Sequence, residues 1–311
     1  MAIAGPICQP ARMRVFVTGA SGFVGRRLLP RLRAAGHEAT GCDREVDVTQ
    51  PEALRAALVR AEPDAVIHLA AMSDVALSWR EPLRCYRINF VGTRTLLAEV
   101  ARVRPAARVL LVGSADQYGP TSEAGSPFDE TTPQRPRSPY ARSKAAAEAL
   151  GTQAAEQGLD VVRIRAFNHT GAGQSDQFVA SSFARQVARI RLGRQEASLR
   201  VGNLDSVRDF LHVDDVLDAY VALLDPSVPA AVYNVAGERA TPIRDVLDRL
   251  VALAGVAPRV EVDPDRFRPT DWLVGDSSRL TRATGWRPRT SLDAILRELY
   301  EHWLAAECRE T

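Results

Sequence analysis

The glycine-rich segment TGASGFVG, residues 18–25, constrains the fold of this chain more than any other feature. It follows a short β-branched run and precedes an amphipathic stretch that ends at Gly36. The spacing of Gly19, Gly22 and Gly25 allows a tight turn and lets the amino-terminus of a helix approach an anion, because the first N–H groups of a helix lack partners within it. The same turn also serves helix–strand packing alone. Its place at the start of a β-α-β unit favours the binding of a dinucleotide.

Strands and helices alternate through the first half of the chain. Strand candidates with apolar residues on both faces lie at 15–18, 64–71, 107–114 and 159–167, and the helices between them are predicted at 51–61, 82–104 and 139–157. Such alternation is typical of a parallel sheet covered on both sides. We therefore predict an α/β fold, a Rossmann-type doubly wound parallel sheet with a smaller α/β substrate-binding region at its C-terminal side.

The pattern changes after residue 167. We predict a loop at 168–178, strands at 198–203 and 231–237, and helices at 178–193, 213–224, 242–254 and 291–306. The predicted division is a disordered leader (1–12), a dinucleotide-binding domain (13–167, to which 205–236 return) and a substrate-binding region (168–204 and 237–311). Ligands of open α/β sheets bind beyond the carboxyl ends of the strands, where this second region would lie.

Composition excludes several classes of function. A net charge of +2, with the arginines spread along the chain, does not indicate a surface that binds nucleic acid. No apolar run approaches the length that spans a membrane. The histidines and cysteines show no metal-ligand spacing, so we predict no metal. Cys8, Cys42, Cys85 and Cys308 are far apart, and we expect them to be reduced thiols of a cytoplasmic protein.

The basic residues single out one position. Of 40 basic residues, 39 are arginine and one is lysine, Lys144, which stands four residues after Tyr140 in a helix predicted to begin after Ser138. This spacing places phenol and ammonium on one helix face. A nearby ammonium lowers the pKa of a phenol, and a compact ammonium bonds ribose hydroxyls that a planar guanidinium fits badly. The alternative is that Tyr140 and Lys144 only contact each other on the surface of the helix. The arginine bias favours a catalytic pair.

Two strand ends add further candidates. The strand at 107–114 ends at Ser114, a position from which a hydroxyl faces the cofactor crevice. The second strand ends at Asp43, with Arg44 beside it. A carboxylate there accepts hydrogen bonds from ribose hydroxyls and favours NAD, whereas an arginine holds the 2′-phosphate of NADP. We predict NAD or NADP, with NAD favoured.

Together these motifs resemble the extended short-chain dehydrogenase/reductase family (the NAD-dependent epimerase/dehydratase family), whose members act on nucleotide sugars. The matching landmarks are TGASGFVG (18–25), HLAA (68–71), NFVGT (89–93), GSADQYG (113–119) and YARSK (140–144). The carboxyl-terminal half is most similar to the branch acting on GDP-mannose derivatives, through RAFNHTGAGQ (165–174), VGNLDSVRDFLHVDDVLDAY (201–220) and RFRPTDWLVGDSSRLTRATGWRP (266–288).

That branch contains 4,6-dehydratases and 4-keto reductases. The two kinds of enzyme differ in the sequence of the loop after the fourth strand. The dehydratases carry Thr and, two positions on, a Glu base, where this chain has Ser114 and Asp116. The shorter Asp would place its carboxylate about 1.5 Å back, a misplacement that can cost about 100-fold in rate. The resemblance therefore implies reduction of a GDP-4-keto-6-deoxy-mannose-type substrate by NAD(P)H, with Tyr140 as proton donor.

Two alternatives stay open. One is a GDP-sugar 4,6-dehydratase, epimerase or other isomerase that uses tightly bound NAD(P) without net redox. The other is a dinucleotide-binding redox sensor, which would not need an activated phenol. The branch usually reads GPGQ where this chain has GAGQ at 171–174, and a hydrophobic residue in place of Thr170, which bears on the identity of the sugar.

The resemblance implies three sets of site residues, a GDP-sugar as partner, and a homodimer formed through the helices at 82–104 and 139–157. The catalytic residues are Ser114, Tyr140, Lys144 and Asp116. The cofactor-binding residues are Gly19, Ser21, Gly22, Phe23, Val24, Gly25, Asp43, Arg44, Asp47, Val48, Leu69, Ala70, Ala71, Asn89, Tyr140 and Lys144. The substrate-binding residues are Asn168, Gln174, Val179, Arg185, Val201, Asn203, Arg208 and Arg268, of which the last two offer planar forks for the diphosphate.

Overall fold

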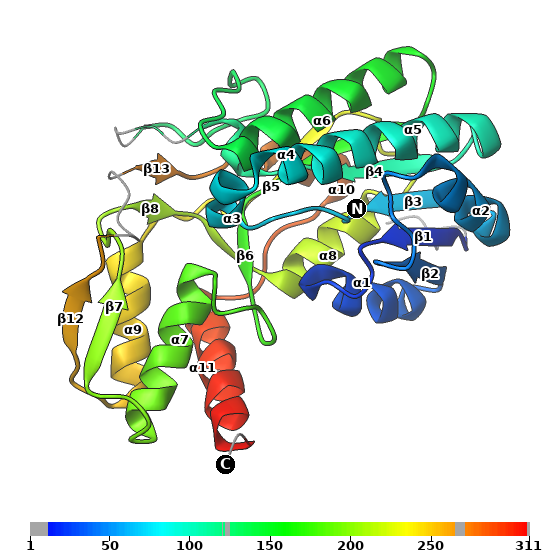
Figure 1. The fold of residues 1–311 in the computed structure, drawn as a ribbon. Coiled ribbons are helices and arrows are strands. Elements are labelled where there is room, and N and C mark those ends of the chain that lie inside the picture. Colours follow the sequence, from blue (N-terminus) through cyan, green and yellow to red (C-terminus); the bar gives the residue numbers. More distant parts are fainter. Residues whose placement is uncertain (1–11, 120, 122–124, 265–270, 310–311) are drawn as a thin grey trace, which may run out of the picture.

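A six-stranded, all-parallel sheet in the order β10-β5-β4-β3-β1-β2 lies at the centre of the computed structural model, which describes residues 12–119, 121, 125–264 and 271–309 (Figure 1). The strands are β1 (Arg14–Thr18), β2 (Glu38–Cys42), β3 (Ala65–His68), β4 (Arg108–Val112), β5 (Val161–Ala166) and β10 (Val232–Val235). The predicted doubly wound parallel sheet is confirmed. Apart from Arg12, the predicted leader lies outside the described residues.

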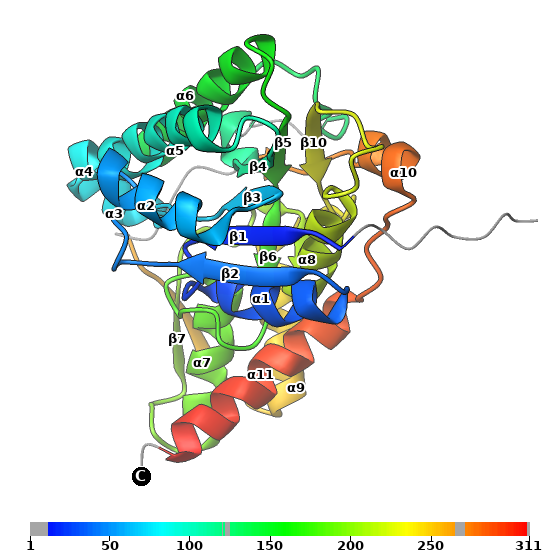
Figure 2. The same ribbon diagram turned by 90° about the vertical axis from the view of Figure 1, so that its right-hand side faces the viewer.

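Two layers of helices cover the sheet, because neighbouring residues of a strand point to opposite faces (Figure 2). Val15 and Val17 of β1 belong to one apolar cluster, and Phe16 between them belongs to another. The first cluster is completed by α1 (Phe23–Ala34) and α8 (Val213–Ala222), the second by α2 (Pro51–Ala61), α5 (Gly92–Val103) and α6 (Pro139–Glu156). The inner strands β1, β3 and β4 therefore carry buried apolar residues on both faces, as the sequence pattern indicated, whereas the edge strand β2 is exposed at three of its five residues.

The helix predicted over 82–104 is confirmed in its extent, but its pitch changes along its length. The segment contains α4 (Pro82–Tyr86), a π-helical turn η1 (Arg87–Val91) and only then α5, and it is preceded by α3 (Val75–Arg80). The wider turn carries Asn89, whose polar side chain is buried and bonded to the backbone of Met72. A continuous apolar pattern does not reveal this change of helical pitch.

The second region has an apolar core of its own, beside the carboxyl ends of the central strands (Figure 1). It is built from α7 (Val179–Arg191), α9 (Ile243–Ala254), α11 (Leu292–Arg309) and the parallel pair β7 (Ser198–Val201) and β12 (Arg259–Val262). The remaining elements are η2 (Ala115–Gln117), β6 (Asn168–Thr170), β8 (Val207–Arg208), β9 (Phe210–His212), β11 (Thr241–Pro242), β13 (Trp272–Leu273) and α10 (Ser278–Thr284).

The predicted loop over 168–178 begins instead with a strand. β6 pairs in parallel with β9, some forty residues further along the chain, and such a distant partner leaves no local signal in the sequence. β10, which falls in the segment expected to return to the first domain, pairs with β5. The division into domains itself stays a prediction. In the part of the chain that is described, no helix is both long and apolar enough to cross a membrane.

Candidate active site

The loop between β1 and α1 forms a cradle that has no room for a side chain at Gly19 or Gly25. Gly19 has a φ of +72°, and a Cβ there would lie 2.7 Å from the Ala70 nitrogen. A Cβ at Gly25 would overlap the Gly19 carbonyl oxygen. No described side chain caps α1 at its N-cap residue, Gly22, so the first N–H groups of the helix are available to an anion. The cradle fits the pyrophosphate of a dinucleotide.

The end of β2 is fastened to this cradle. Asp43 accepts a hydrogen bond from the Ser21 nitrogen at 2.8 Å and another from the Ser21 hydroxyl. Burial opposes the charged form of Asp43, but the bonds from Ser21 and the charge of Arg44 hold its pKa below the ordinary value. A carboxylate and a guanidinium therefore stand side by side where the ribose of a dinucleotide would bind.

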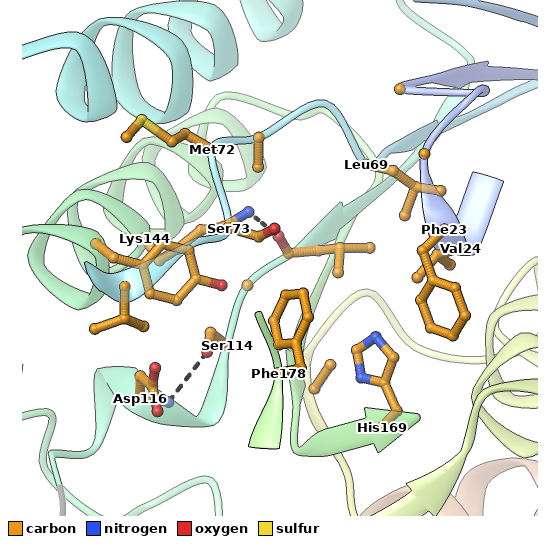
Figure 3. A pocket seen from close by; sticks show the side chains of 18 of the residues that line it. Phe23, Val24, Leu69, Met72, Ser73, Ser114, Asp116, Lys144, His169 and Phe178 are labelled. Atoms are coloured by element: carbon orange, nitrogen blue, oxygen red, sulfur yellow. Dashed lines mark hydrogen bonds between the residues drawn. The ribbon is translucent and has the colours of Figure 1, made fainter. Parts of the chain in front are cut away.

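A cavity of about 1700 Å³ extends from the cradle to the loops of the second region (Figure 3). Most of the predicted site residues line it. They are Ser114, Asp116, Tyr140 and Lys144 of the catalytic set; Gly19, Ser21, Gly22, Phe23, Val24, Gly25, Asp43, Arg44, Asp47, Val48, Leu69, Ala70 and Ala71 of the cofactor set; and Asn168, Gln174, Val179 and Arg208 of the substrate set. This volume exceeds that of a typical pocket for one small ligand, and it suits two ligands that meet.

Asn89, predicted as a cofactor contact, does not line the cavity. Its side chain is buried, accepts a hydrogen bond from the Met72 nitrogen at 2.8 Å and donates to the Met72 carbonyl oxygen at 3.1 Å. It also donates to the Ser143 hydroxyl at 2.9 Å. Asn89 therefore joins the loop after β3 to α6, and its contacts are those of an ordering residue.

Three predicted substrate residues also lie away from the cavity lining. Arg185 forms ion pairs with Asp176 and Glu307. Val201 is fully buried in the core of the second region, and Asn203 accepts a hydrogen bond from the nitrogen of residue 205. These contacts do not support the predicted roles. A motif match gives the place of a residue along the chain but does not fix the direction of its side chain. Arg268 lies outside the described residues.

Tyr140, Lys144 and Ser114 converge at the carboxyl end of the central strands. Helix α6 begins after its N-cap residue Ser138, so Tyr140 and Lys144 lie one turn apart near its start, and each is only 8% exposed. The Lys144 ammonium donates a hydrogen bond to the carbonyl oxygen of Val112, the last residue of β4, at 2.8 Å (Figure 3). The hydroxyl of Ser114, two residues further, lies near enough to the Tyr140 phenol to lower its pKa. The structure thus brings the predicted set together.

The prediction that Lys144 lowers the pKa of Tyr140 is wrong in this structure. Burial raises the pKa of Tyr140 above its ordinary value, the negative charge of Asp116 raises it further, and the bond with Ser114 opposes both. Burial also lowers the pKa of Lys144 to about 8. A phenol with a raised pKa stays protonated at neutral pH, so Tyr140 carries its proton in this structure.

Asp116 lies on the turn η2, near the ion pair that Arg208 forms with Asp271. Arg208 Nη1 lies 2.6 Å from Asp271 Oδ1, although no hydrogen bond from a described residue is directed at that oxygen. Burial raises the pKa of Asp116, and Asp271 adds to this, whereas Arg208 opposes it. All three line the cavity. The predicted diphosphate ligand Arg208 therefore faces the site, with Asp271 as a member that the sequence analysis missed.

Two exposed aromatic residues in the cavity were also missed. Phe178, directly before α7, is 39% exposed, and Figure 3 shows it along one side of the cavity with His169 and Phe23. Trp79 of α3 is 57% exposed. Rings of this kind pack on planar or apolar parts of a ligand. Sequence periodicity does not separate them from core aromatics, because a cavity wall and a core face show the same pattern.

The glycine cradle and the Ser–Tyr–Lys set at the ends of a parallel sheet define a dinucleotide-dependent enzyme of the short-chain dehydrogenase/reductase class. The family model described as GDP-mannose 4,6 dehydratase matches residues 44–299. The chain belongs to this family.

Relatives with several activities resemble the chain along most of its length. It is 40% identical to a GDP-6-deoxy-D-mannose reductase from Pseudomonas aeruginosa, over 93% of this chain and 97% of the relative. It is 32% identical to GDP-mannose 4,6 dehydratase 1 from Arabidopsis thaliana, over 85% and 74%. The solved structure of RMD from Pseudomonas aeruginosa complexed with NADPH superposes with a TM-score of 0.87 at 38% identity, and covers 94% of this chain and 99% of that one.

Proposed function

We propose that this chain reduces the 4-keto group of a GDP-4-keto-6-deoxy-mannose-type sugar with NAD(P)H. The observation that carries the proposal is the pairing of a buried Tyr140 with Ser114 beside Asp116, because this loop has the shorter acid where a dehydratase of the family has a Glu base. Tyr140 stays protonated at neutral pH, as a group that gives a proton to the keto oxygen must be. The 40% identity to a GDP-6-deoxy-D-mannose reductase supports the same reaction.

The residues of the chain have separate tasks in this reaction. The bound reduced cofactor supplies the hydride. The Ser114 hydroxyl hydrogen-bonds the keto oxygen and stabilises the negative charge that develops there, while the Tyr140 phenol gives that oxygen its proton. Lys144, held at Val112 and charged below about pH 8, bonds the cofactor ribose.

The substrate residues line the wall formed by the second region. Arg208 offers its guanidinium to the diphosphate, in competition with Asp271. Asn168, Gln174 and Val179 line the same cavity and would contact the sugar and the nucleotide of the bound substrate. Phe178, half exposed in the same wall, provides an apolar face for the sugar or base.

The first test mixes the purified protein with GDP-4-keto-6-deoxy-mannose and follows the absorbance band of NADH and, separately, of NADPH. We expect the band to disappear in proportion to the keto sugar added. GDP-mannose serves as the matched control substrate, which we expect to leave the band unchanged and to yield no 4-keto product. Retention of bound cofactor with no net consumption would instead support an isomerase or dehydratase.

Cofactor preference is proposed to rest on Asp43 and Arg44. Asp43→Asn keeps an acceptor for Ser21 but removes the charge that repels a 2′-phosphate, so it is expected to raise the ratio of kcat/KM for NADPH to that for NADH about fivefold to tenfold. Arg44→Ala is expected to lower the ratio by a similar factor. Steady-state kinetics with both cofactors check this. An unchanged ratio in both variants would place the discrimination elsewhere.

We further propose that the protein is a cytoplasmic homodimer that pairs the helical segment 82–104 (α4, η1 and α5) and α6 with their counterparts. Leu83 of α4, in the first of these segments, is an apolar side chain that is 85% exposed. The buried Cys42 and Cys85 are free thiols, as suits a reducing compartment. Light scattering coupled to gel filtration is expected to give twice the chain mass of 33.9 kDa. A mass of 33.9 kDa at micromolar concentration would contradict the dimer.

A further inference from the structure

A fully buried glutamine lies next to Ser114, the residue proposed to hydrogen-bond the keto oxygen of the substrate. Gln117, in the turn η2, is 0% exposed. Its Oε1 accepts a hydrogen bond from the Ser114 nitrogen at 2.8 Å, and its Nε2 donates to Glu148 Oε2 at 2.7 Å. Gly113 leaves the room that this requires, because a Cβ there would overlap the Gln117 amide oxygen. Gln117 therefore connects the backbone of Ser114 to helix α6.

At the far end of this connection, the side chain of Glu148 is held in place by several hydrogen bonds. Glu148 is buried and accepts hydrogen bonds from Arg165 Nε at 2.9 Å and Nη2 at 2.6 Å. Gln134 Nε2 donates to its Oε1 at 2.6 Å. With Gln117, four donor atoms hold the carboxylate of Glu148, which leaves it little freedom to move.

Glu148 also belongs to the helix that carries the other two members of the catalytic set. It follows Lys144 by one turn and Tyr140 by two, on the same side of α6. Ser114 belongs to a different element, the segment after β4, and its hydroxyl accepts a hydrogen bond from the nearby Asp116 nitrogen at 3.2 Å. The Gln117–Glu148 connection is thus a direct link between the two elements whose separation sets the distance from Ser114 to Tyr140.

We infer that Gln117 is a positioning residue for the reduction, which holds Ser114 in register with Tyr140 by bonding its backbone to Glu148. The inference rests on the proposed function, in that Ser114 and Tyr140 act on the keto oxygen. A misplacement of about 1 Å at such a contact can cost about 100-fold in rate. A role in stability alone would also explain a buried glutamine, so the test separates the two.

The test uses a matched pair of variants. Gln117→Met and Gln134→Met each remove one amide bond to Glu148, but only Gln117 contacts Ser114. We expect Gln117→Met to lower kcat about 10-fold to 100-fold with KM for the sugar and Kd for NADPH unchanged, and Gln134→Met to stay within about twofold of wild type. In a Ser114→Ala background, Gln117→Met is expected to add little further loss, because it acts through Ser114.

A second readout does not depend on any substrate. Gln117→Met removes the acceptor of the Ser114 N–H, so the amide hydrogens of 113–119 are expected to exchange faster, whereas Gln134→Met leaves them unchanged. If Gln117→Met does not fold, Gln117→Asn, whose amide is one methylene shorter, takes its place. Equal losses of kcat in the two Met variants, or losses that multiply fully with Ser114→Ala, would overturn the inference. Failure of wild type to oxidise NAD(P)H would overturn the proposed function alone, and the exchange data would still decide the positioning.

Discussion

Replacing Tyr140 by phenylalanine is expected to lower kcat by about 10³-fold, while the Kd for NAD(P)H stays within about threefold of wild type. The variant keeps the ring that packs against Met72 and Cys85 and removes only the hydroxyl. Without that hydroxyl the keto oxygen loses its proton donor, a contribution typically of about 10²–10⁴-fold. Single-turnover absorbance measurements, which separate the reduction from product release, check the result.

A matched control is available in the second region. Tyr300 is as buried as Tyr140, at 8% exposure, but lies in the apolar cluster of α11 and not in the cavity lining. Tyr300→Phe is therefore expected to retain wild-type turnover. If Tyr140→Phe kept more than about a tenth of the wild-type rate while binding cofactor normally, the proton would have to come from another group, and the assignment of Tyr140 would fail.

Exchanging the lone lysine for arginine is expected to lower kcat by at least about 100-fold. Lys144 is 8% exposed, and its compact ammonium fits against the Val112 carbonyl oxygen at 2.8 Å. A planar guanidinium in that space would displace the start of α6 or turn away from Val112, and it fits ribose hydroxyls badly. The loss is therefore expected in both kcat and cofactor affinity, measured by steady-state kinetics and by fluorescence titration of NAD(P)H.

The control for this exchange lies two residues away. Arg142 is on the exposed side of the same helix, and Arg142→Lys changes the same two residue types in the opposite direction. It is expected to leave turnover unchanged. Because burial lowers the pKa of Lys144 to about 8, we also expect wild-type turnover to fall as the pH rises through that value. Near-normal activity of Lys144→Arg would mean that a positive charge suffices and that the ammonium has no specific role.

Local patterns in the sequence predicted the central sheet and most of the site. The strand–glycine–helix order around Gly19 and the single lysine in α6 depend on neighbours within a few residues, and the structure places both as expected. The carboxyl ends of parallel strands meet at one edge, so Ser114 and Asp43 were brought to the same cavity by topology.

What the sequence did not predict depends on distant contacts. The pairing of β6 with β9, the inward turn of Asn89 and the burial that raises the pKa of Tyr140 all arise from elements far apart along the chain. Val201 shows the same limit, because a motif match placed it in the substrate site while the fold buries it in a core. Side-chain direction and desolvation are properties of the packed structure and leave no periodic signal.

The most direct test of the reduction follows the hydride itself. NAD(P)H deuterated at C4 of the nicotinamide, prepared separately with each stereochemistry, is incubated with the enzyme and GDP-4-keto-6-deoxy-mannose, and the product is analysed by mass spectrometry and NMR. We expect one of the two labelled cofactors to yield one deuterium per product molecule at C4 of the sugar, with one oxidised cofactor formed for each. A converted sugar that carries no deuterium from either cofactor, with no net oxidation, would contradict the assignment as a reductase.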